Sequence, residues 1–334
     1  MRVVAAVDKF RGTATAADVA SAIGNACWDL GLECVEIPVA DGGEGTLEAL
    51  GGANRTSTVS GPLGDLVEAR WRLHRDTAVI EMAAASGLTL AGGADGNDAM
   101  AASTTGTGEL IDMALDAGAK RIIVCLGGSA TTDGGLGAVR AIHAPHRLRG
   151  VQLLVACDVR TRFTDAATVF GPQKGATPAQ VKLLTGRLER IAQIYAQEHG
   201  IDVRTIDGTG AAGGLAGGLL ALGGQLLPGF ELVADELDLH DAIAAADIVV
   251  TGEGFLDEQS FEGKVVGGVQ ELAMAAGKAV GAVVGDVAQD VADRIEHVAL
   301  AAEYGLDRAM KEPLWCIERA AATLIERLRV RLSS

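Results

Sequence analysis

The chain has 334 residues, of which 49% are apolar but only 3% aromatic, so small aliphatic side chains must build its core. This composition is typical of parallel sheets covered by helices, and the length suffices for one large α/β unit or two domains. The formal net charge of -16 argues against nucleic acid or an anionic membrane as a partner, because their phosphates would be repelled. An anionic small substrate remains open, since a local site can be positive on an acidic molecule.

The cysteines and the N-terminal residues indicate the cellular compartment. The five cysteines form no C-x-x-C pair, and Cys125 and Cys157 stand in apolar runs where thiols behave as small hydrophobes. The first ten residues are too short and too soon charged for a signal peptide. No apolar run approaches the ~18 residues of a membrane span. We therefore expect a reduced, cytoplasmic enzyme.

The N-terminal residues predict a strand–helix–strand unit. Residues 2–7 form a short apolar run, Thr15 begins a helix with apolar side chains at helical spacing, and residues 34–39 form the next strand. Parallel strands joined by a helix end at the same edge of a sheet. Asp8 and Asp41 follow the two strands, so both carboxylates should reach that edge.

A polar or glycine-rich segment also follows each of several later strands. The strands are expected at 121–126, 153–157, 248–250 and 279–284, and they lead into GGSATTDGG, Asp158, TGEG and Gly285-Asp286 respectively. Open α/β sheets bind ligands beyond the carboxyl ends of their strands. This repeated placement predicts an active site at that edge.

The fold class expected from these patterns is α/β. Residues 1–53 and 240–334 are assigned to one doubly wound, parallel-sheet domain of Rossmann or flavodoxin type. Residues 54–239 are assigned to a second α/β domain inserted into the first, because the strand–loop pattern is less regular there.

Two glycine-rich segments are candidates for binding phosphate. In residues 127–135, glycines would let backbone N–H groups approach an oxyanion at a helix N-terminus, and Ser129, Thr131 and Thr132 would add hydroxyl donors. Residues 104–110 (TTGTGEL) repeat the design more weakly, and both segments also fit an ordinary turn before a capped helix. The candidate nucleotide-binding residues are Gly127, Gly128, Ser129, Thr131, Asp133, Gly134, Gly106 and Thr107.

Two acidic segments are candidates for metal binding and catalysis. In ADGGEGT (40–46), Asp41 and Glu44 could bind substrate hydroxyls, hold Mg²⁺ or take a proton, although a surface turn has the same sequence signal. TGEGFLDEQSFEGK (251–264) combines carboxylates with a lysine, which suits a metal–phosphate site as well as a solvated loop. Its candidate residues are Glu253, Asp257, Gln259 and Lys264.

Basic residues in two further loops could bind an acid. Arg11, in the D-K-F-R-G segment 8–12, could hold a carboxylate through two parallel hydrogen bonds. Lys174, in the FGPQKGA loop, could bind a carboxylate or phosphate, although loop lysines are usually just exposed.

One motif favours a rival function. Residues 208–213 match G-x-G-x-x-G after a predicted strand at 203–206, which would fit a nicotinamide-dependent oxidoreductase, but no second strand with a terminal acid follows. The Walker pattern is absent, and the histidines form no zinc-ligand cluster.

Taken together and in order, these segments resemble the bacterial glycerate kinase family over nearly the whole chain. The matching segments are DKFRGT (8–13), ADGGEGT (40–46), EMAAASGL (81–88), TGTGELI (105–111), GGSATTDGG (127–135), ACDV (156–159), FGPQKGAT (170–177), GAAGG (210–214) and TGEG…D-x-Q…GK (251–264). A single segment would mean little, whereas the ordered set is specific.

The resemblance implies two α/β domains around a cleft and transfer of the γ-phosphoryl group of ATP, with Mg²⁺, to glycerate. It implies a nucleotide-facing role for GGSATTDGG and places Asp8, Arg11, Asp41 and Lys264 near the reacting groups. We expect Asp41 or Asp158 to orient or deprotonate the substrate hydroxyl. The expected Mg²⁺ ligands are Asp158, Asp257 and Glu253. Family analogy favours phosphorylation at O2 rather than O3, and the sequence leaves a homodimer open.

The chain departs from the family pattern at polar positions. Lys9 and Arg11 replace the family's serine and lysine, Thr132 replaces its asparagine, Phe255 replaces its arginine, and residues 160–163 (RTRF) replace its N-P-L. These changes concern substrate recognition more than fold. A kinase of another small hydroxy acid, or a weakly active paralogue that binds nucleotide or metabolite as a regulator, therefore stays open beside a glycerate kinase.

Overall fold

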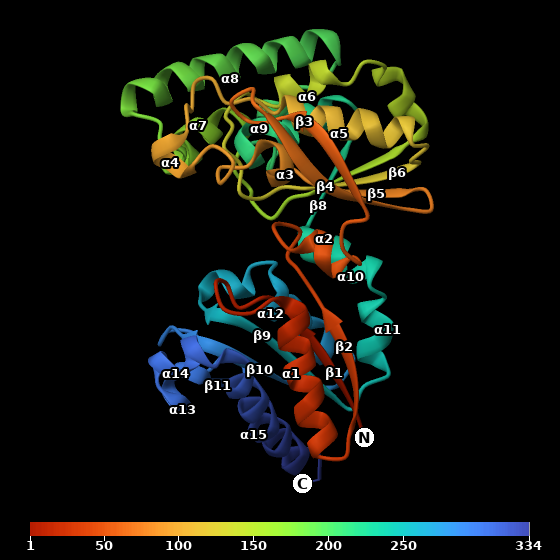
Figure 1. Ribbon diagram of the computed structural model, residues 1–334, viewed down its shortest axis with the longest axis vertical. Coiled ribbons are helices and arrows are strands. Elements are labelled where there is room, and N and C mark those ends of the chain that lie inside the picture. Colours follow the sequence, from red (N-terminus) through yellow and green to blue (C-terminus); the bar gives the residue numbers. More distant parts are fainter. Residues whose placement is uncertain (334) are drawn as a thin grey trace. The chain divides into compact units, whose positions relative to one another are not determined.

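The computed structural model describes residues 1–333 and separates into two compact units (Figure 1). Unit 1 comprises residues 1–41 and the chain from Phe230 onward, and unit 2 comprises Gly42–Gly229. Both units contain parallel strands and helices, so the expected α/β class is confirmed.

The division falls at 41/42 and 229/230, rather than at the expected 53/54 and 239/240. Gly45 and Leu47 donate backbone hydrogen bonds of 2.9 and 2.8 Å to the Glu81 carboxylate, which fastens the segment after Asp41 to unit 2. The ring of Phe230 packs so closely on Gly268 that an added Cβ would lie 2.2 Å from it, which holds the start of the returning chain in unit 1.

Unit 1 is built from five strands and their covering helices. Its elements are β1 (Arg2–Val7), α1 (Ala16–Asp29), β2 (Glu33–Pro38), α10 (Gly229–Glu236), α11 (Leu239–Ala244), β9 (Ile248–Leu256), the 3₁₀ turn η5 (Glu258–Phe261), α12 (Val265–Ala275), β10 (Ala279–Val287), β11 (His297–Ala299), α13 (Leu300–Tyr304), α14 (Leu306–Lys311) and α15 (Pro313–Ser333).

The sheet of unit 1 is entirely parallel, in the order β11-β10-β9-β1-β2. Numbered along the chain within this unit, that order is 2-1-3-4-5, the flavodoxin-like arrangement. Its topological switch point lies between β1 and β9, which pair with Val3 opposite Ile248 and Ala5 opposite Val250. Ligands of such sheets bind beyond the carboxyl ends of the strands at the switch point.

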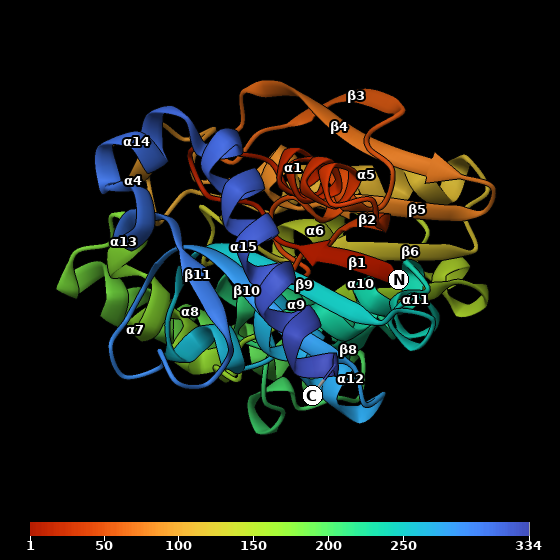
Figure 2. The same cartoon turned by 90° about the horizontal axis from the view of Figure 1, so that it is seen from below.

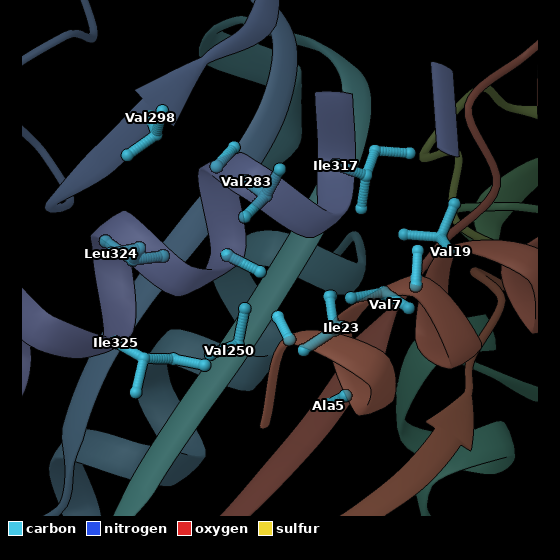
Figure 3. Close-up of a cluster of buried hydrophobic side chains, with 14 of the residues drawn as sticks. Ala5, Val7, Val19, Ile23, Val250, Val283, Val298, Ile317, Leu324 and Ile325 are labelled. Atoms are coloured by element: carbon cyan, nitrogen blue, oxygen red, sulfur yellow. The ribbon is translucent and has the colours of Figure 1, made fainter. Parts of the chain in front are cut away.

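Side chains that alternate along the strands fill two hydrophobic layers. Figure 3 shows Val283 of β10 and Val250 of β9 packing with Ile23 of α1 and Leu324 of α15. The neighbours Ala282 and Val284 face the opposite side, where they pack with α12. Figure 2 shows α15 lying across β9 and β10. Helices therefore cover both faces of this sheet, as expected for a doubly wound unit.

The expected first helix begins where its capping signal predicts. Thr15 Oγ1 accepts a 3.1 Å hydrogen bond from the backbone N–H of Asp18, and the Asp18 carboxylate accepts one of 3.2 Å from the Thr15 N–H. This reciprocal pair satisfies two backbone donors that a helix N-terminus otherwise leaves without partners.

Unit 2 contains a larger, mixed sheet and more helices than unit 1. Its elements are α2 (Thr46–Ala49), β3 (Arg55–Ser60), β4 (Leu66–His74), β5 (Thr77–Glu81), α3 (Ala83–Ser86), α4 (Gly93–Gly96), α5 (Thr105–Asp116), β6 (Arg121–Cys125), α6 (Leu136–Ala141), η1 (Pro145–Gly150), β7 (Gln152–Ala156), η2 (Phe163–Asp165), α7 (Ala166–Phe170), η3 (Pro172–Lys174), α8 (Pro178–Glu198), η4 (Val203–Thr205), α9 (Ala211–Ala221) and β8 (Gln225–Leu227).

The sheet of unit 2 has the order β3-β4-β5-β6-β7-β8. The first three strands are antiparallel neighbours, whereas β5 to β8 run parallel. Helices α5, α6 and α9 share one hydrophobic core with this sheet. Helix α8 forms a second core with α7 and η2, beside partly buried side chains of α6.

Two sequence expectations about local structure were wrong. Residues 203–205 form a 3₁₀ turn and not a strand, so the G-x-G-x-x-G match lacks the strand that a dinucleotide-binding turn requires. Strands β9 and β10 also continue through TGEG and Gly285-Asp286, because Glu253 pairs with Val284 and Phe255 with Asp286. Among residues 1–333, no helix is long and apolar enough to span a membrane.

Candidate functional site

The acidic and basic candidates of unit 1 gather at the switch point of its sheet. β9 runs on past the end of β1, and the Asp8 N–H donates a 3.0 Å hydrogen bond to the Gly252 carbonyl. The Asp8 carboxylate accepts a 2.7 Å hydrogen bond from the Lys9 N–H and lies 3.8 Å from Lys9 Nζ. Glu253 is the next residue of β9, which brings a second carboxylate to the same edge.

These carboxylates share one electrostatic environment. Burial raises the pKa of Asp8 to about 6, with a further rise from Asp41, while Lys9 and Lys264 oppose it. Burial also raises the pKa of Glu253 to about 7. Ser260 and Lys264 lower that pKa, whereas Asp8 and Asp257 raise it. We call Asp8, Asp41, Glu253 and Lys264 the switch-point cluster.

The oxygen atoms of this edge differ in their remaining capacity to bind a ligand. Glu253 Oε1 is buried and has no hydrogen-bond partner among the described residues. Asp257 Oδ1 instead caps the 3₁₀ turn η5, accepting from the N–H and the hydroxyl of Ser260 at 3.2 and 3.4 Å. A buried acceptor without a donor is costly unless a proton, a water or a cation completes it. Glu253 therefore has the chemistry of a metal ligand or a proton acceptor.

Arg11, Lys264 and Phe255 lie on segments that reach this edge of unit 1. Gly254 approaches the first loop so closely that an added Cβ would lie 3.3 Å from the Arg11 backbone nitrogen. The Arg11 side chain is exposed, and Lys264 stands half-buried at the start of α12. Phe255, on the same face of β9 as Glu253 by strand alternation, is 52% exposed.

In unit 2, a second set of candidates lies at the carboxyl ends of the parallel strands. Glu81, Cys125 and Ala156 pair across β5, β6 and β7, so Gly127 and Asp158 follow at neighbouring positions on one edge. An added Cβ on Gly127 would lie 3.2 Å from Gly43 Cα, so Gly43, in the unit 2 part of the ADGGEGT segment, packs against this edge. Asp158 Oδ1 accepts a 2.6 Å hydrogen bond from the Gly229 N–H.

Much of GGSATTDGG is an internal junction and not an exposed loop. Gly127 and Gly128 reach the surface, but Thr131 and Thr132 are fully buried. The carbonyl of Gly213 accepts a 3.0 Å hydrogen bond from the Gly134 N–H. An added Cβ on Gly213 would lie 1.9 Å from the Thr131 carbonyl oxygen, so this glycine serves close backbone packing.

Asp133 accepts hydrogen bonds at the N-termini of two helices. Its Oδ2 accepts from the N–H and the hydroxyl of Thr104, both at 2.8 Å, and from the Gly137 N–H at 3.2 Å. Its Oδ1 accepts from the Gly135 N–H at 3.1 Å. Because Thr104 precedes α5 and Gly135 precedes α6, one carboxylate joins both N-termini. This geometry favours a structural role for Asp133 over direct contact with a nucleotide.

Gly106 and Thr107 also lie inside the fold. An added Cβ on Gly106 would lie 1.9 Å from the Ser60 carbonyl oxygen at the end of β3. The buried hydroxyl of Thr107 is hydrogen-bonded to Ser86 at 2.8 Å. Both residues belong to α5 itself rather than to a loop before it, so they serve helix packing in this structure.

Lys174 is the functional candidate whose environment differs most from expectation. Its side chain is 2% exposed, and Nζ donates to the Thr131 carbonyl at 2.6 Å and to Ser129 Oγ at 3.3 Å. Asn97 donates to the carbonyls of both Ala130 and Lys174, at 3.0 and 2.8 Å. Burial lowers the pKa of Lys174 to about 8. Lys174 and Asn97 therefore hold the 129–131 backbone in one conformation.

The predicted residues are thus brought together in two groups. Asp8, Asp41, Glu253 and Lys264 interact within unit 1, while Gly127, Gly128 and Asp158 share a strand edge in unit 2. The predicted metal ligands Glu253 and Asp257 belong to unit 1 and Asp158 to unit 2. Within residues 1–333, no three His, Cys, Asp or Glu side chains form a group that could hold a metal ion by themselves.

Sequence reasoning did not identify Glu81 and Asn97. Glu81 binds the backbone of Gly45 and Leu47, and Asn97 binds that of Ala130 and Lys174. Glu81 opens the EMAAASGL segment, whose position at the end of a strand was the available signal. Asn97 carried no signal, because its partners lie far away in the sequence.

A parallel sheet of flavodoxin-like order with coupled acids and a lysine at its switch point defines an α/β protein with a polar ligand site. The sequence model of the Glycerate kinase family matches residues 3–145 and 142–331. Glycerate 2-kinase of Escherichia coli is 39% identical over 320 residues, covering 84% of each chain. Glycerate kinase of Haemophilus influenzae is 40% identical over 320 residues, again covering 84% of each.

A solved structure agrees with these relatives. The crystal structure assigned as glycerate kinase 2 of Salmonella typhimurium superposes with a TM-score of 0.85 at 34% identity, covering 100% of both chains. The chain belongs to the glycerate kinase family.

Proposed function

We propose that this protein is a glycerate kinase that transfers the γ-phosphoryl group of Mg-ATP to O2 of D-glycerate. The observation that carries the proposal is the switch-point cluster, in which two carboxylates with raised pKa values interact with Lys264. Phosphoryl transfer depends chiefly on alignment and charge neutralisation, together with a group that orients or deprotonates the attacking hydroxyl.

The chain's own residues divide into roles by their chemistry. Asp8 or Glu253 is suited to accept the hydroxyl proton, because a pKa of about 6 or 7 matches neutral operating pH. Asp41 would orient the same hydroxyl, and Asp158 remains the alternative for that task. Lys264 and Arg11 would offset the negative charge of the phosphoryl and carboxylate groups.

The carboxylates of unit 1 could supply one or two protein ligands to Mg²⁺. Mg²⁺ is commonly held by one or two carboxylates together with substrate phosphates and water, so a three-residue protein cage is not required. Where Asp8 is the proton acceptor, Glu253 Oε1, buried and with no hydrogen-bond partner among the described residues, would be one ligand. Asp257, whose charge raises the pKa of Glu253, is the second candidate. When bound, the ion would neutralise charge on the transferring phosphoryl group.

The nucleotide is proposed to use the exposed part of the unit 2 edge. Gly127 and Gly128 offer backbone N–H groups there. Lys174 stabilises the backbone that follows them through its hydrogen bond to the Thr131 carbonyl. Ser129, Thr131, Asp133, Gly134, Gly106 and Thr107 would act by shaping this edge and not by touching phosphate. The enzyme would be a reduced, cytoplasmic protein, and a homodimer is compatible with the proposal.

A second candidate is a kinase of another small hydroxy acid. It is favoured by Phe255, an exposed apolar side chain that shares a strand face with Glu253 at a position where the family has arginine. Such a side chain would suit an acceptor with an apolar substituent better than glycerate.

The test is an acceptor assay with product identification. Purified protein with ATP and Mg²⁺ is given D-glycerate, L-glycerate, glycolate or D-lactate, and ADP release is followed. Phosphorus NMR then distinguishes 2- from 3-phosphoglycerate. We expect D-glycerate to give the highest kcat/KM, a 2-phospho product, and loss of turnover when EDTA removes the metal. Faster turnover with lactate would favour the second candidate, and ATP binding without turnover on any acceptor would point to a regulatory protein.

A further inference from the structure

Unit 2 contains a pocket that the proposed reaction does not use. It lies among the start of α5, helix α6 and helix α8, and its volume is about 630 Å³. Three arginines are among its lining residues, Arg140 of α6 and Arg187 and Arg190 of α8. We call this the arginine pocket. Figure 1 shows α8 and α6 as parts of the same helical region.

The three arginines have no carboxylate partner among the described residues. Elsewhere in unit 2, arginines form ion pairs, such as Arg147 with Asp116 at 2.7 Å and Arg162 with Asp207 at 3.0 Å. In a chain with a net charge of -16, three arginines thus gather around one pocket, with Arg140 and Arg190 exposed to solvent. Their charge is available to an anion that enters from solution.

The geometry leaves most guanidinium donors free for a ligand. Arg187 gives one donor to the Met100 carbonyl at 2.8 Å, and Arg190 gives one to Gln193 Oε1 at 3.2 Å. A guanidinium carries five N–H donors in a planar fork, so each of these side chains can still donate hydrogen bonds to an oxyanion. Arg187 and Arg190 lie three residues apart on α8 and therefore share one face.

The remaining lining defines the kind of anion. Asp133 also borders the pocket, where it accepts hydrogen bonds from Thr104, Gly135 and Gly137, and the three arginines outnumber this one carboxylate. The hydroxyls of Ser103 and Thr105, hydrogen-bonded to each other at 2.8 Å, lie at one end. Alanine, leucine and isoleucine side chains form the rest. Mostly apolar walls, a few convergent polar groups and this volume are typical of a small-molecule site.

We propose that the arginine pocket binds a phosphate-bearing metabolite, with the phosphate on Arg140 and Arg190 and the organic part on the aliphatic wall. A phosphate dianion matches the surplus positive charge, and its oxygens match the arginine forks. The ligand is either a nucleoside polyphosphate or a smaller phosphate ester, since both offer this group. The site is assigned without reference to the proposed kinase reaction, and it is tested by binding.

The test compares Arg140→Gln/Arg190→Gln with a matched Arg149→Gln variant, which changes an exposed unit 2 arginine outside the pocket. Titration calorimetry measures binding of inorganic pyrophosphate, of AMP-PNP and of 2-phosphoglycerate to each folded protein. Since a charge-assisted hydrogen bond contributes about tenfold or more to affinity, we expect a binding step separate from that of the reaction site, which the double variant weakens ~100-fold and the control keeps.

The choice of probe identifies the source of the phosphate. Loss confined to AMP-PNP and pyrophosphate assigns the pocket to a nucleotide, and loss confined to 2-phosphoglycerate and pyrophosphate assigns it to a small ester. Both support the proposal. Equal affinities in wild type and double variant for every probe, or no binding of any probe by wild type, would overturn it. Neither result depends on whether the protein turns over glycerate.

Discussion

Two carboxylates of unit 1 hold their protons close to neutral pH. Burial raises the pKa of Asp8 to about 6 and that of Glu253 to about 7, although Lys264 opposes both shifts. A surface carboxylate would be fully ionised under the same conditions. Groups with such pKa values are concentrated at functional sites, because general acids and bases work best near the ambient pH.

The first prediction concerns pH. We expect kcat/KM for D-glycerate to rise as pH increases through about 6 to 7, because the proton acceptor must be ionised. Glu253→Gln should remove the part of this rise near pH 7 and lower kcat/KM by about 100-fold or more. Glu258→Gln, an exposed neighbour, is the control. An unchanged profile in Glu253→Gln would remove Glu253 from the mechanism.

The same shift has a consequence for stability. The folded state binds the Glu253 proton more tightly than the unfolded state, so its contribution to the free energy of unfolding decreases as pH rises from the ordinary glutamate pKa to about 7. Glu253→Gln should flatten this decrease. Urea unfolding at pH 5 and pH 8 measures the difference between the two proteins, and equal slopes would contradict a protonated, buried Glu253.

Lys174 gives a prediction in which stability and activity separate. Lys174→Met leaves the Thr131 carbonyl without a donor, which costs about 1–3 kcal/mol, but it also removes a buried charge. We expect a small net change in stability and a rise of about fivefold or more in KM for ATP, because the 129–131 backbone loses its support. Lys182→Met, on the exposed face of α8, should leave KM unchanged.

The pH dependence of stability supplies an independent readout for Lys174. Its pKa of about 8 in the folded protein is below that of an ordinary lysine, so the unfolded state binds more protons between these values. Wild-type stability should therefore gain a contribution as pH rises from 8 to about 10. The gain should be absent from Lys174→Met, and its persistence there would show that another group causes it.

At the scale of elements, several glycines hold helices close to their neighbours. Gly106 lets α5 approach the Ser60 carbonyl at the end of β3, and Gly108 lets it approach the Ala138 carbonyl in α6. Gly186, in the middle of α8, has nothing within 4 Å of its added Cβ and has a helical environment. Replacing glycine by alanine should therefore change the stability in opposite directions at Gly106 and at Gly186.

Alanine substitution should distinguish these two situations. Gly106→Ala should destabilise the protein by about 2 kcal/mol or more, because the Cβ can be accommodated only by moving α5 away from β3. Gly186→Ala should stabilise it by roughly 0.5–1 kcal/mol through helix propensity. Thermal unfolding of both variants measures this, and a neutral Gly106→Ala would contradict the packing role.

The elements that sequence predicted well are those fixed by local signals. The strand–helix–strand unit at the N-terminus carries its own capping box at Thr15 and Asp18 and its own apolar spacing. Strand β9 was predicted too short, because glycines weaken a strand signal, whereas pairing with β10 carries it to Leu256. Helix α5 includes its glycines because Asp133, distant in sequence, binds Thr104 just before it.

The candidate site shows the same limit. Asp8, Asp41, Glu253 and Lys264 were predicted to share an edge, since strand ends in a parallel sheet converge there, and they do interact. The buried part of GGSATTDGG was not predicted, because glycines for phosphate contact and glycines for backbone packing look alike in sequence. The partners that decide between them, Gly213 and Lys174, lie in other segments.

At the scale of the whole molecule, composition and charge set the class of protein but not its chemistry. The acidic chain gathers three arginines around the arginine pocket, while Lys264 stands amid carboxylates in unit 1. An acidic protein that acts on anions must offset its own repulsion locally. The proposed function therefore requires that the switch-point cluster take part in phosphoryl transfer.

The most direct measurement is glycerate-dependent ADP release by wild type, Lys264→Met and Lys278→Met at saturating Mg-ATP. Lys278 is a half-buried lysine of the same unit that lies outside the cluster. We predict turnover in wild type and Lys278→Met and a loss of about 100-fold or more in Lys264→Met, because charge on the transferring group would lose its neutralising partner. Lys264→Met with wild-type turnover, or wild type without any, would contradict the account.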